Sequence, residues 1–245
     1  MKERVILISG GTRGLGRKIV EYFSVQGDKV CFIYKDSSVL AKEICHIAEK
    51  ESRQVAAFQG NVTDAKQLKK IVREVLLNYG KIDVLINNAG VAKETLFVKI
   101  NADDWDEVVR CNLKSVYLLC KEVSKAMIKK KKGHIVNISS IVGLEGRKTL
   151  SSYAASKAGV IALTKSLAKE FGGYNVKVNT VLPGFLMTNM TKNVSKEELK
   201  NIKKNNVLNR LNEPEEIAKF LYNLSYMDNV SGQIFNLDSR IYKTF

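Results

Sequence analysis

Tyr153 and Lys157 stand four residues apart, in a stretch of small residues that runs from Ser151 to Gly159. On a helix this spacing places both side chains on one face. A lysine ammonium beside a phenol stabilises the phenolate, so the pair is expected to lower the tyrosine pKa from its usual value of about 10. A tyrosine tuned in this way can exchange a proton with a substrate oxygen near neutral pH. The spacing therefore predicts acid–base chemistry at Tyr153.

The same spacing occurs a second time, at Tyr117 and Lys121, so the surroundings have to separate the two pairs. Tyr117 stands among valine, leucine and cysteine and is interpreted as part of a buried helix face. Tyr153 is flanked by serine and alanine, which leave room for a ligand. Ser140 precedes it by thirteen residues at the end of an apolar run, with the neighbouring Ser139 as the alternative hydroxyl. These surroundings assign the chemistry to Tyr153.

The elements that must position these residues alternate along the chain, apolar runs of strand length with helical stretches. The expected strands are Arg4–Ser9, Lys29–Tyr34, Gln54–Gln59, Ile82–Ile86, His134–Ser139, Lys177–Leu182 and Gln233–Leu237. The expected helices are Gly14–Gln26, Ser38–Glu51, a helix that Thr63 and Asp64 can cap and that ends at about Asn78, Asp103–Lys130, Ser152–Phe171, a polar helix from Ser195, and Glu213–Tyr222. Strands with almost no polar alternation are buried on both faces, which implies a parallel sheet covered by helices on both sides. We predict an α/β fold, a single-domain doubly wound Rossmann fold over residues 1–245. Its seven-stranded, mostly parallel sheet would carry a ligand crevice at the carboxyl ends of the strands.

The charge of the chain suggests an anionic partner. Lysine and arginine number 40 against 25 acidic residues, a net charge of +15. A lysine-rich solvated surface explains part of this charge, and an acidic partner is the sharper explanation. The densest cluster, Lys129–Lys132, ends an expected helix, where it also complements the helix dipole. Basic stripes interleaved with aromatic residues are lacking, so nucleic-acid binding is not expected as the main function.

The cysteines and histidines favour neither a metal site nor disulfides. Four cysteines occur without a Cys-x-x-Cys pair, and His46 and His134 lack metal-ligand spacing. The apolar run Val5–Ile8 is too short for a signal peptide, and no segment has the length of a membrane span. We expect a soluble, cytoplasmic protein that holds no metal and has no membrane contact.

Two turns have the composition of a dinucleotide site. Glycines at 10, 14 and 16 follow the first expected strand with the spacing G-x-x-x-G-x-G. They permit a tight turn and let a pyrophosphate approach the backbone N–H groups at the start of the next helix. Asn87-Asn88-Ala89-Gly90 follows the fourth expected strand, where carboxamides can bond to the backbone and to a cofactor. An ordinary strand-exit turn is the alternative for this second stretch.

Together with Asn112, Ser140, Tyr153, Lys157 and Pro183-Gly184, these turns resemble the short-chain dehydrogenase/reductase family over essentially the whole chain. Within that family the chain is most similar to bacterial 3-oxoacyl-[acyl-carrier-protein] reductases. The stretches 135–143, 183–188 and 210–218 carry this closer similarity. The resemblance implies a homotetramer and a substrate loop at about 187–210.

The resemblance also implies a role for each catalytic residue. Tyr153 would be the general acid in reduction, and Ser140 would hydrogen-bond and polarise the substrate carbonyl. Lys157 would hold the nicotinamide ribose and lower the pKa of Tyr153. Asn112 would hold a water in a proton relay from Lys157, or, as the alternative, would bond a backbone carbonyl inside its helix.

The resemblance assigns cofactor contacts to Gly10, Thr12, Arg13, Gly14, Leu15, Gly16, Lys35, Asn61, Val62, Asn88, Ala89, Gly90, Tyr153, Lys157, Pro183, Gly184 and Leu186. Relatives that prefer NAD usually carry an acidic residue at the end of the second strand. Here Tyr34 and Lys35 stand at that point, and Arg13 lies within the glycine turn. Two cations suit a 2′-phosphate, so NADPH is expected, while Asp36 keeps NADH as the alternative.

The expected reaction is the NADPH-dependent reduction of a 3-oxoacyl thioester on acyl carrier protein, in fatty acid synthesis. The acidic carrier would dock through Lys129 and Lys130. The alternative is a short-chain reductase that acts on a CoA thioester or on another small ketone or alcohol. Three departures bear on the substrate: Tyr174 stands where a docking cation is expected, Val207 replaces a proline, and Leu237–Arg240 replaces an Asn-Gly-Gly ending.

Overall fold

A computed structural model describes residues 3–188, 191 and 194–241. Seven strands form one sheet in the order β3-β2-β1-β4-β5-β6-β7, and every neighbouring pair is parallel. The strands are β1 (Val5–Ser9), β2 (Lys29–Tyr34), β3 (Val55–Gln59), β4 (Val84–Asn87), β5 (Gly133–Ile138), β6 (Val176–Leu182) and β7 (Ile234–Asn236). The predicted α/β fold is confirmed, and each strand begins and ends within two residues of its expected bounds.

Alternate residues of each strand enter two separate cores. In β1, Val5 and Leu7 pack into one cluster, and Ile6 and Ile8 pack into the other. All four are at most 1% exposed. A strand covered on both sides has no face for polar residues, which explains the unbroken apolar runs of the sequence.

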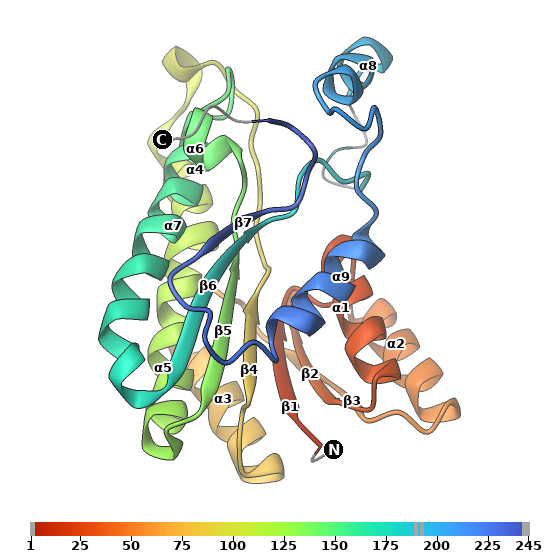
Figure 1. Cartoon of the computed structure of the whole chain (residues 1–245), viewed down its shortest axis with the longest axis vertical. Coiled ribbons are helices and arrows are strands. Elements are labelled where there is room, and N and C mark those ends of the chain that lie inside the picture. Colours follow the sequence, from red (N-terminus) through yellow and green to blue (C-terminus); the bar gives the residue numbers. More distant parts are fainter. Residues whose placement is uncertain (1–2, 189–190, 192–193, 242–245) are drawn as a thin grey trace.

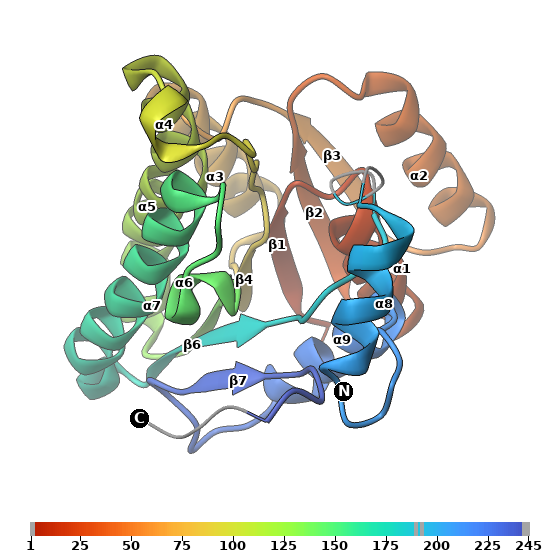
Figure 2. The same ribbon diagram turned by 90° about the horizontal axis from the view of Figure 1, so that it is seen from above.

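Helices cover both faces of the sheet, as Figure 1 shows. The helices are α1 (Gly14–Val25), α2 (Ser38–Lys50), α3 (Ala65–Tyr79), α4 (Ala102–Val109), α5 (Ser115–Lys130), α6 (Val142–Glu145), α7 (Ser151–Phe171), α8 (Lys196–Lys204) and α9 (Pro214–Leu224). Side chains of α1, α2 and α9 pack on one face, and those of α3, α5 and α7 pack on the other. In Figure 1, α8 stands above these layers, and in the view from above in Figure 2 it lies in front of α1 and α9.

The long helix expected over Asp103–Lys130 is interrupted. Between α4 and α5 the backbone forms a π-helical segment, η2 (Arg110–Lys114), with Asn112 buried at its centre. Such a segment inserts an extra residue without ending the helix, and it is frequent at functional sites. The prediction of one regular helix was therefore wrong at the point where a candidate catalytic residue stands.

Two expected helix starts are confirmed by their caps. The Asp64 carboxylate accepts from the backbone N–H groups of Lys66 and Gln67, and the Ser195 hydroxyl accepts from that of Glu198. The short elements η1 (Phe97–Lys99), α6 and η3 (Gly172–Tyr174) were not expected. Within the described residues, no helix combines the length and the apolar character needed to cross a bilayer.

Candidate active site

A cleft of about 1190 Å³ runs along the carboxyl ends of the strands. Its walls come from the loops that follow β1 to β6, as the parallel topology requires. All predicted site residues except Asn112 line it, namely Gly10, Thr12, Arg13, Gly14, Leu15, Gly16, Lys35, Asn61, Val62, Asn88, Ala89, Gly90, Ser140, Tyr153, Lys157, Pro183, Gly184 and Leu186. Residues as distant in the sequence as Gly10 and Leu186 therefore share one cavity.

The glycine turn leaves room for a ligand at the start of α1. Gly10 and Gly14 have positive φ, at 73° and 52°, and a Cβ added at Gly16 would stand 1.9 Å from the Gly10 carbonyl oxygen. Side chains are thus excluded from this turn. Helix α1 begins at an N-cap residue, Arg13, with no cap from a described side chain and no acidic residue in its first turn. The helix-start N–H groups and the dipole therefore favour an anion there, which fits the pyrophosphate of a dinucleotide.

The two asparagines that follow β4 have different surroundings. The Asn88 amide donates to the carbonyl oxygens of Ser9 and Gly10, at 3.2 and 3.0 Å, and so fixes the glycine turn against the next loop. The Asn87 amide instead lies in the core and donates to Asn137 Oδ1 at 2.8 Å. Asn88 shapes the cleft wall, whereas Asn87 joins the buried strands.

Exposed charges stand where the adenosine ribose is expected. Lys35 and Asp36, directly after β2, are 65% and 79% exposed, and their charged atoms are 3.7 Å apart. Arg13, across the glycine turn, is exposed and lines the same part of the cleft. The Asp36 carboxylate thus forms only a long, exposed ion pair with Lys35. The cations Arg13 and Lys35 line the same cleft.

At the other end of the cleft, α7 brings Tyr153 and Lys157 beside Ser140. The Tyr153 hydroxyl is hydrogen-bonded to Ser140. The Lys157 ammonium lies 5.6 Å from the centre of the Tyr153 ring and donates to the Ile138 carbonyl oxygen at 2.9 Å. Lys157 is 4% exposed. A phenol, a hydroxyl and a cation therefore converge on one point of the cavity.

Burial sets the pKa values of this pair. Burial raises the pKa of Tyr153, and the hydrogen bond with Ser140 opposes this rise only in part. Burial also lowers the pKa of Lys157 to about 8. The sequence predicted that Lys157 would lower the pKa of Tyr153, and the structure differs because loss of hydration is the largest influence on the phenol and raises its pKa. Tyr153 is therefore protonated at neutral pH.

The structure separates the two neighbouring serines. The Ser139 hydroxyl is buried and donates to the Lys157 carbonyl oxygen at 2.8 Å, which ties β5 to α7. The Ser140 hydroxyl accepts from the backbone N–H of Val142 at 3.2 Å and also meets Tyr153. Ser140 thus has the contact with the phenol, and Ser139 has a contact with the backbone.

Asn112 lies behind the cleft and is fully buried. Its carboxamide bonds to the backbone of Val91 and donates to the Ser156 hydroxyl at 3.1 Å. A Cβ added at Gly90 would stand 3.2 Å from Asn112 Oδ1 and 3.6 Å from Lys157 Nζ. The absence of a side chain at Gly90 keeps a small space between these two groups.

The second tyrosine–lysine pair lies outside the cleft. Tyr117 is 44% exposed on α5, and the Lys121 ammonium donates to its hydroxyl at 3.2 Å. The prediction of a buried helix face was correct for Val116, Leu118 and Leu119, which are at most 9% exposed, but wrong for Tyr117. Tyr117 falls outside the apolar stripe of α5, because successive residues of a helix point in different directions around its axis.

Lys129 and Lys130 do not lie at the cleft. They end α5, and the chain then turns at Lys131 into the amino end of β5, whereas the cleft lies at the carboxyl ends. Lys130 donates to the Gly80 carbonyl oxygen at 2.6 Å. Tyr174, the expected second docking position, is 46% exposed.

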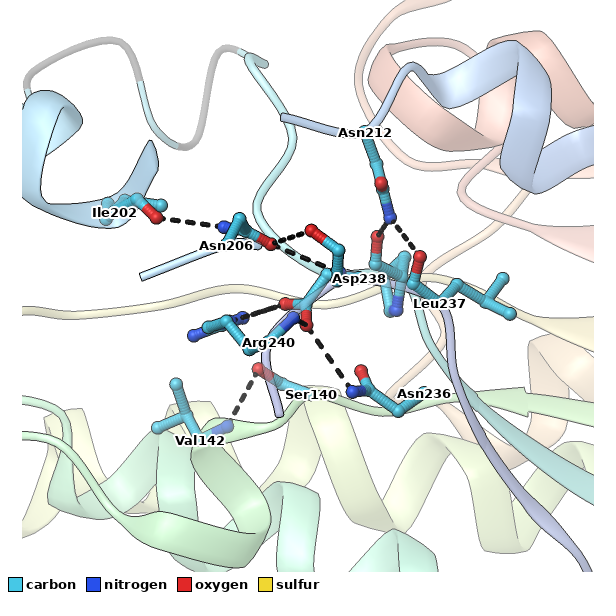
Figure 3. Close-up of polar contacts among 11 residues, drawn as sticks. Ser140, Val142, Ile202, Asn206, Asn212, Asn236, Leu237, Asp238 and Arg240 are labelled. Carbon is cyan, nitrogen blue, oxygen red and sulfur yellow. Dashed lines mark hydrogen bonds and ion pairs between the residues drawn. The ribbon is translucent and has the colours of Figure 1, made fainter. Parts of the chain in front are cut away.

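The C-terminal segment contributes contacts that sequence reasoning did not find. Figure 3 shows Asp238 and Arg240 beside the region of Ser140, with Asn206 and Asn212 bonded to the same segment. Asn206 accepts from the backbone N–H of Ser239 at 3.2 Å. Asn212 donates to the carbonyl oxygens of Pro183 and Leu237, at 3.0 and 2.7 Å.

Arg240 lines the cleft, and so does Arg147 from the loop between α6 and α7. Leu237–Arg240 stands where relatives have an Asn-Gly-Gly ending. This difference was the only signal in the sequence that indicated the side of the cleft formed by the C-terminal segment. Nothing local in the sequence indicated Arg147.

A sequence model of the short chain dehydrogenase family matches residues 4–199. The 3-oxoacyl-[acyl-carrier-protein] reductase FabG of Thermotoga maritima is 37% identical over 244 residues, which cover 97% of each protein. A 3-oxoacyl-[acyl-carrier-protein] reductase of Synechocystis sp. is 37% identical over 238 residues, 96% of this chain and 95% of that protein.

Solved structures superpose along almost the full chain. A putative gluconate dehydrogenase from Agrobacterium tumefaciens has a TM-score of 0.91 and 28% identity, over 96% of this chain and 94% of that one. The crystal structure of gox2181 has a TM-score of 0.91 and 27% identity, over 98% and 95% of the two chains.

Proposed function

Because the chain belongs to the short-chain dehydrogenase family, and is therefore an oxidoreductase that uses a nicotinamide dinucleotide, we propose that it reduces 3-oxoacyl thioesters carried by acyl carrier protein, with NADPH. The observation that carries this proposal is the convergence of Ser140, Tyr153 and Lys157 in a cleft whose other end suits a pyrophosphate. The two similar reductases support the substrate class. The single sheet from β1 to β7 supports one catalytic domain over residues 1–245.

In this proposal, Tyr153 supplies the proton that the reduced carbonyl oxygen needs. A bound nicotinamide dinucleotide supplies the hydride to the carbonyl carbon. The Ser140 hydroxyl donates to the carbonyl oxygen and holds it beside the phenol of Tyr153. Burial keeps that phenol protonated at neutral pH, which is the state that a proton donor requires. Lys157, still largely charged near pH 7, holds the ribose of the cofactor.

Asn112 would restore the proton through a water. Its Oδ1 atom and Lys157 Nζ both face the space beside Gly90, where a bridging water would have two polar partners. The bonds from Asn112 to Val91 also place this loop, so a relay role and a positioning role are compatible.

The preference for NADPH rests on Arg13 and Lys35. Both are exposed and line the cleft beyond β1 and β2. A guanidinium and an ammonium bind a 2′-phosphate by charge-assisted hydrogen bonds. Asp36 opposes this preference only weakly, since it is highly exposed.

A carrier protein that docks on Lys129 and Lys130 would sit at the edge of the sheet opposite the cleft of the same chain. We keep these lysines as a candidate docking site only within the homotetramer that the family resemblance implies. The exposed aromatic surface at Tyr117 on α5 supports such an assembly.

A second candidate is the oxidation or reduction of a small polyhydroxy acid or ketone. It is favoured by the similarity of the fold to a putative gluconate dehydrogenase. The same proton donor and hydride chemistry would serve either substrate.

The test is NADPH oxidation with acetoacetyl-acyl carrier protein, followed as loss of nicotinamide absorbance. Turnover that exceeds that with gluconate-type substrates and small ketones supports the thioester reductase. Turnover of the polyhydroxy substrates alone would replace it with the second candidate. Binding of NADPH provides the control that the protein is folded.

A further inference from the structure

Among the arginines that line the cleft, Arg147 and Arg240 each form an ion pair with a carboxylate. Arg147, which follows α6, forms an ion pair with Glu198 on α8. Arg240 forms an ion pair with Asp238 in the C-terminal segment. The two ion pairs differ in how deeply the carboxylate is buried and in how many bonds hold it. This difference identifies which arginine can exchange its carboxylate for a ligand.

The Asp238–Arg240 pair is part of a fixed structure. The Asp238 side chain is 3% exposed and accepts from both the backbone N–H and the Nε–H of Arg240, at 3.1 and 2.6 Å. A Cβ added at Gly184 would stand 2.6 Å from the Asp238 Cβ, so the carboxylate is packed against this turn. Figure 3 shows these bonds on one short segment. Removing Arg240 from this carboxylate would leave a buried charge, which is unfavourable.

The Arg147–Glu198 pair is open to solvent. The two side chains are 33% and 42% exposed and come from segments 51 residues apart. Helix α8, which lies wholly within the described part of the chain, buries none of its residues. Packing therefore does not hold Glu198 in place, and water weakens an ion pair at this exposure. Another anion of suitable shape can displace Glu198 without a loss of buried contacts.

The place of this pair indicates which anion that is. Arg147 lines one side of the cleft, and Val194 and Ile202, on either side of Glu198 in the sequence, line the side formed by α8. A thioester substrate of a carrier protein or of CoA reaches Tyr153 on a flexible pantetheine arm that ends in a phosphate. An arm that leaves the cleft between Arg147 and α8 passes the Arg147–Glu198 pair. A guanidinium offers two parallel donors that match phosphate oxygens.

We infer that Arg147 binds the phosphate of the phosphopantetheine arm, and that Glu198 occupies this site until the substrate arrives. The inference deepens the proposed function and rests on it. Binding exchanges one anion for another, so Arg147 remains neutralised in both states. Release of Glu198 frees the first turn of α8, while Asn206, just beyond its last turn, stays bonded to Ser239.

The test compares two ligands that differ only by the phosphate, 4′-phosphopantetheine and pantetheine, titrated into the complex with NADP⁺ by calorimetry. The wild-type protein is expected to bind the phosphorylated ligand about tenfold more tightly. Arg147→Gln should bring this ratio to about one and leave the affinity for pantetheine unchanged. Glu198→Gln, which removes the competing carboxylate, should tighten binding of the phosphorylated ligand. Lys148→Gln, at the exposed neighbouring position, is the matched control and should keep the wild-type ratio.

Three results would overturn the inference. The first is a wild-type affinity ratio near one between the phosphorylated and the unphosphorylated ligand, and the second is a ratio that stays unchanged in Arg147→Gln. The third is an equal loss of this ratio in Lys148→Gln, which would mean that the phosphate responds only to the overall positive charge of the surface. Turnover of acetoacetyl-CoA and acetoacetyl-acyl carrier protein adds a separate measurement. Arg147→Gln should raise KM for both, since both carry the phosphate. An effect on the carrier-protein substrate alone would mean that Arg147 contacts the carrier itself.

The proposed function fails independently of this inference. If the wild-type protein reduces neither thioester but still prefers the phosphorylated ligand through Arg147, the phosphate site stands and the reaction has to be reassigned. If it reduces both thioesters with no preference for the phosphate, the reaction stands and the site is wrong.

Discussion

Asn112 holds the backbone of Val91 through both halves of its carboxamide. It accepts from the Val91 N–H at 2.8 Å and donates to the Val91 carbonyl oxygen at 2.9 Å. Through Asn112, the π-helical segment η2 therefore fixes the position of the loop that follows β4. Asn88 and Gly90 of this loop line the cleft. A regular helix would place these atoms differently, because the extra residue of η2 changes the direction of its side chains.

Asn112→Ala should lower the free energy of unfolding by about 2–4 kcal/mol, because the Val91 backbone loses both partners in a buried place. Chemical denaturation measures this loss. Ser156→Ala removes a single bond to the same carboxamide and should cost about 1 kcal/mol. If Asn112→Ala unfolds like the wild-type protein and yet loses turnover, the residue acts through a water relay and not through the loop.

Tyr153→Phe should lower kcat by about 10²–10⁴-fold, because the phenol is the proton donor. The affinity for NADPH, measured by fluorescence titration, should stay near that of the wild-type protein. The chain offers its own control in Tyr117→Phe, since Tyr117 has a lysine at the same spacing but is exposed outside the cleft. Turnover at the wild-type rate in Tyr153→Phe would exclude the proposed proton donor.

Stability should rise with pH above about 8 through Lys157. Burial lowers the pKa of this lysine to about 8, below its ordinary value of 10.5. Below pH 8 the folded state carries a buried charge. Between the two pKa values the folded state has lost the proton and the unfolded state still binds it, so the unfolding free energy increases with pH, by roughly 3 kcal/mol in total.

Denaturation of the wild-type protein and of Lys157→Met across this range tests the assignment. The variant should be the more stable protein near neutral pH, and its advantage should shrink as the pH rises toward 10.5. A difference that stays constant over this window would show that Lys157 keeps its ordinary pKa.

Arg13→Ala and Lys35→Ala should each raise KM for NADPH about tenfold and leave KM for NADH unchanged, since only NADPH carries the 2′-phosphate. Because both cations are exposed, the effect should weaken as salt is added. Lys42→Ala, on the exposed face of α2, is the control and should change neither constant. An equal change for the two cofactors would place these side chains against the pyrophosphate instead.

The sheet could be predicted because its strands are buried on both faces. Runs such as Val5–Ile8 contain no polar residue. The run stays recognisable as a buried strand whichever apolar residues it contains. The η2 segment could not be predicted, since one extra residue leaves the apolar pattern on either side intact. The polar Asn112 within that pattern was the only available signal.

The cofactor end of the cleft could be predicted for a similar reason. Its residues follow strands directly, and the topology gathers them at one edge. The substrate end depends on pairs such as Arg147 with Glu198 and Asn206 with Ser239, which are brought together only by the tertiary fold. The pKa of Tyr153 was misjudged because a charged neighbour is visible in a sequence, whereas the loss of hydration is not.

The absence of buried residues in α8 has a consequence for how proteins of this kind diversify. Substitutions along α8 remove no core contact, so they should lower the free energy of unfolding less than substitutions in the core. The stability that the protein needs to function therefore limits change less in α8 than elsewhere in the chain. Mutation can explore this wall of the substrate cleft freely, while the glycine turn and the sheet stay constant. A library restricted to residues 195–205 is therefore a practical starting point for directed evolution toward new substrates.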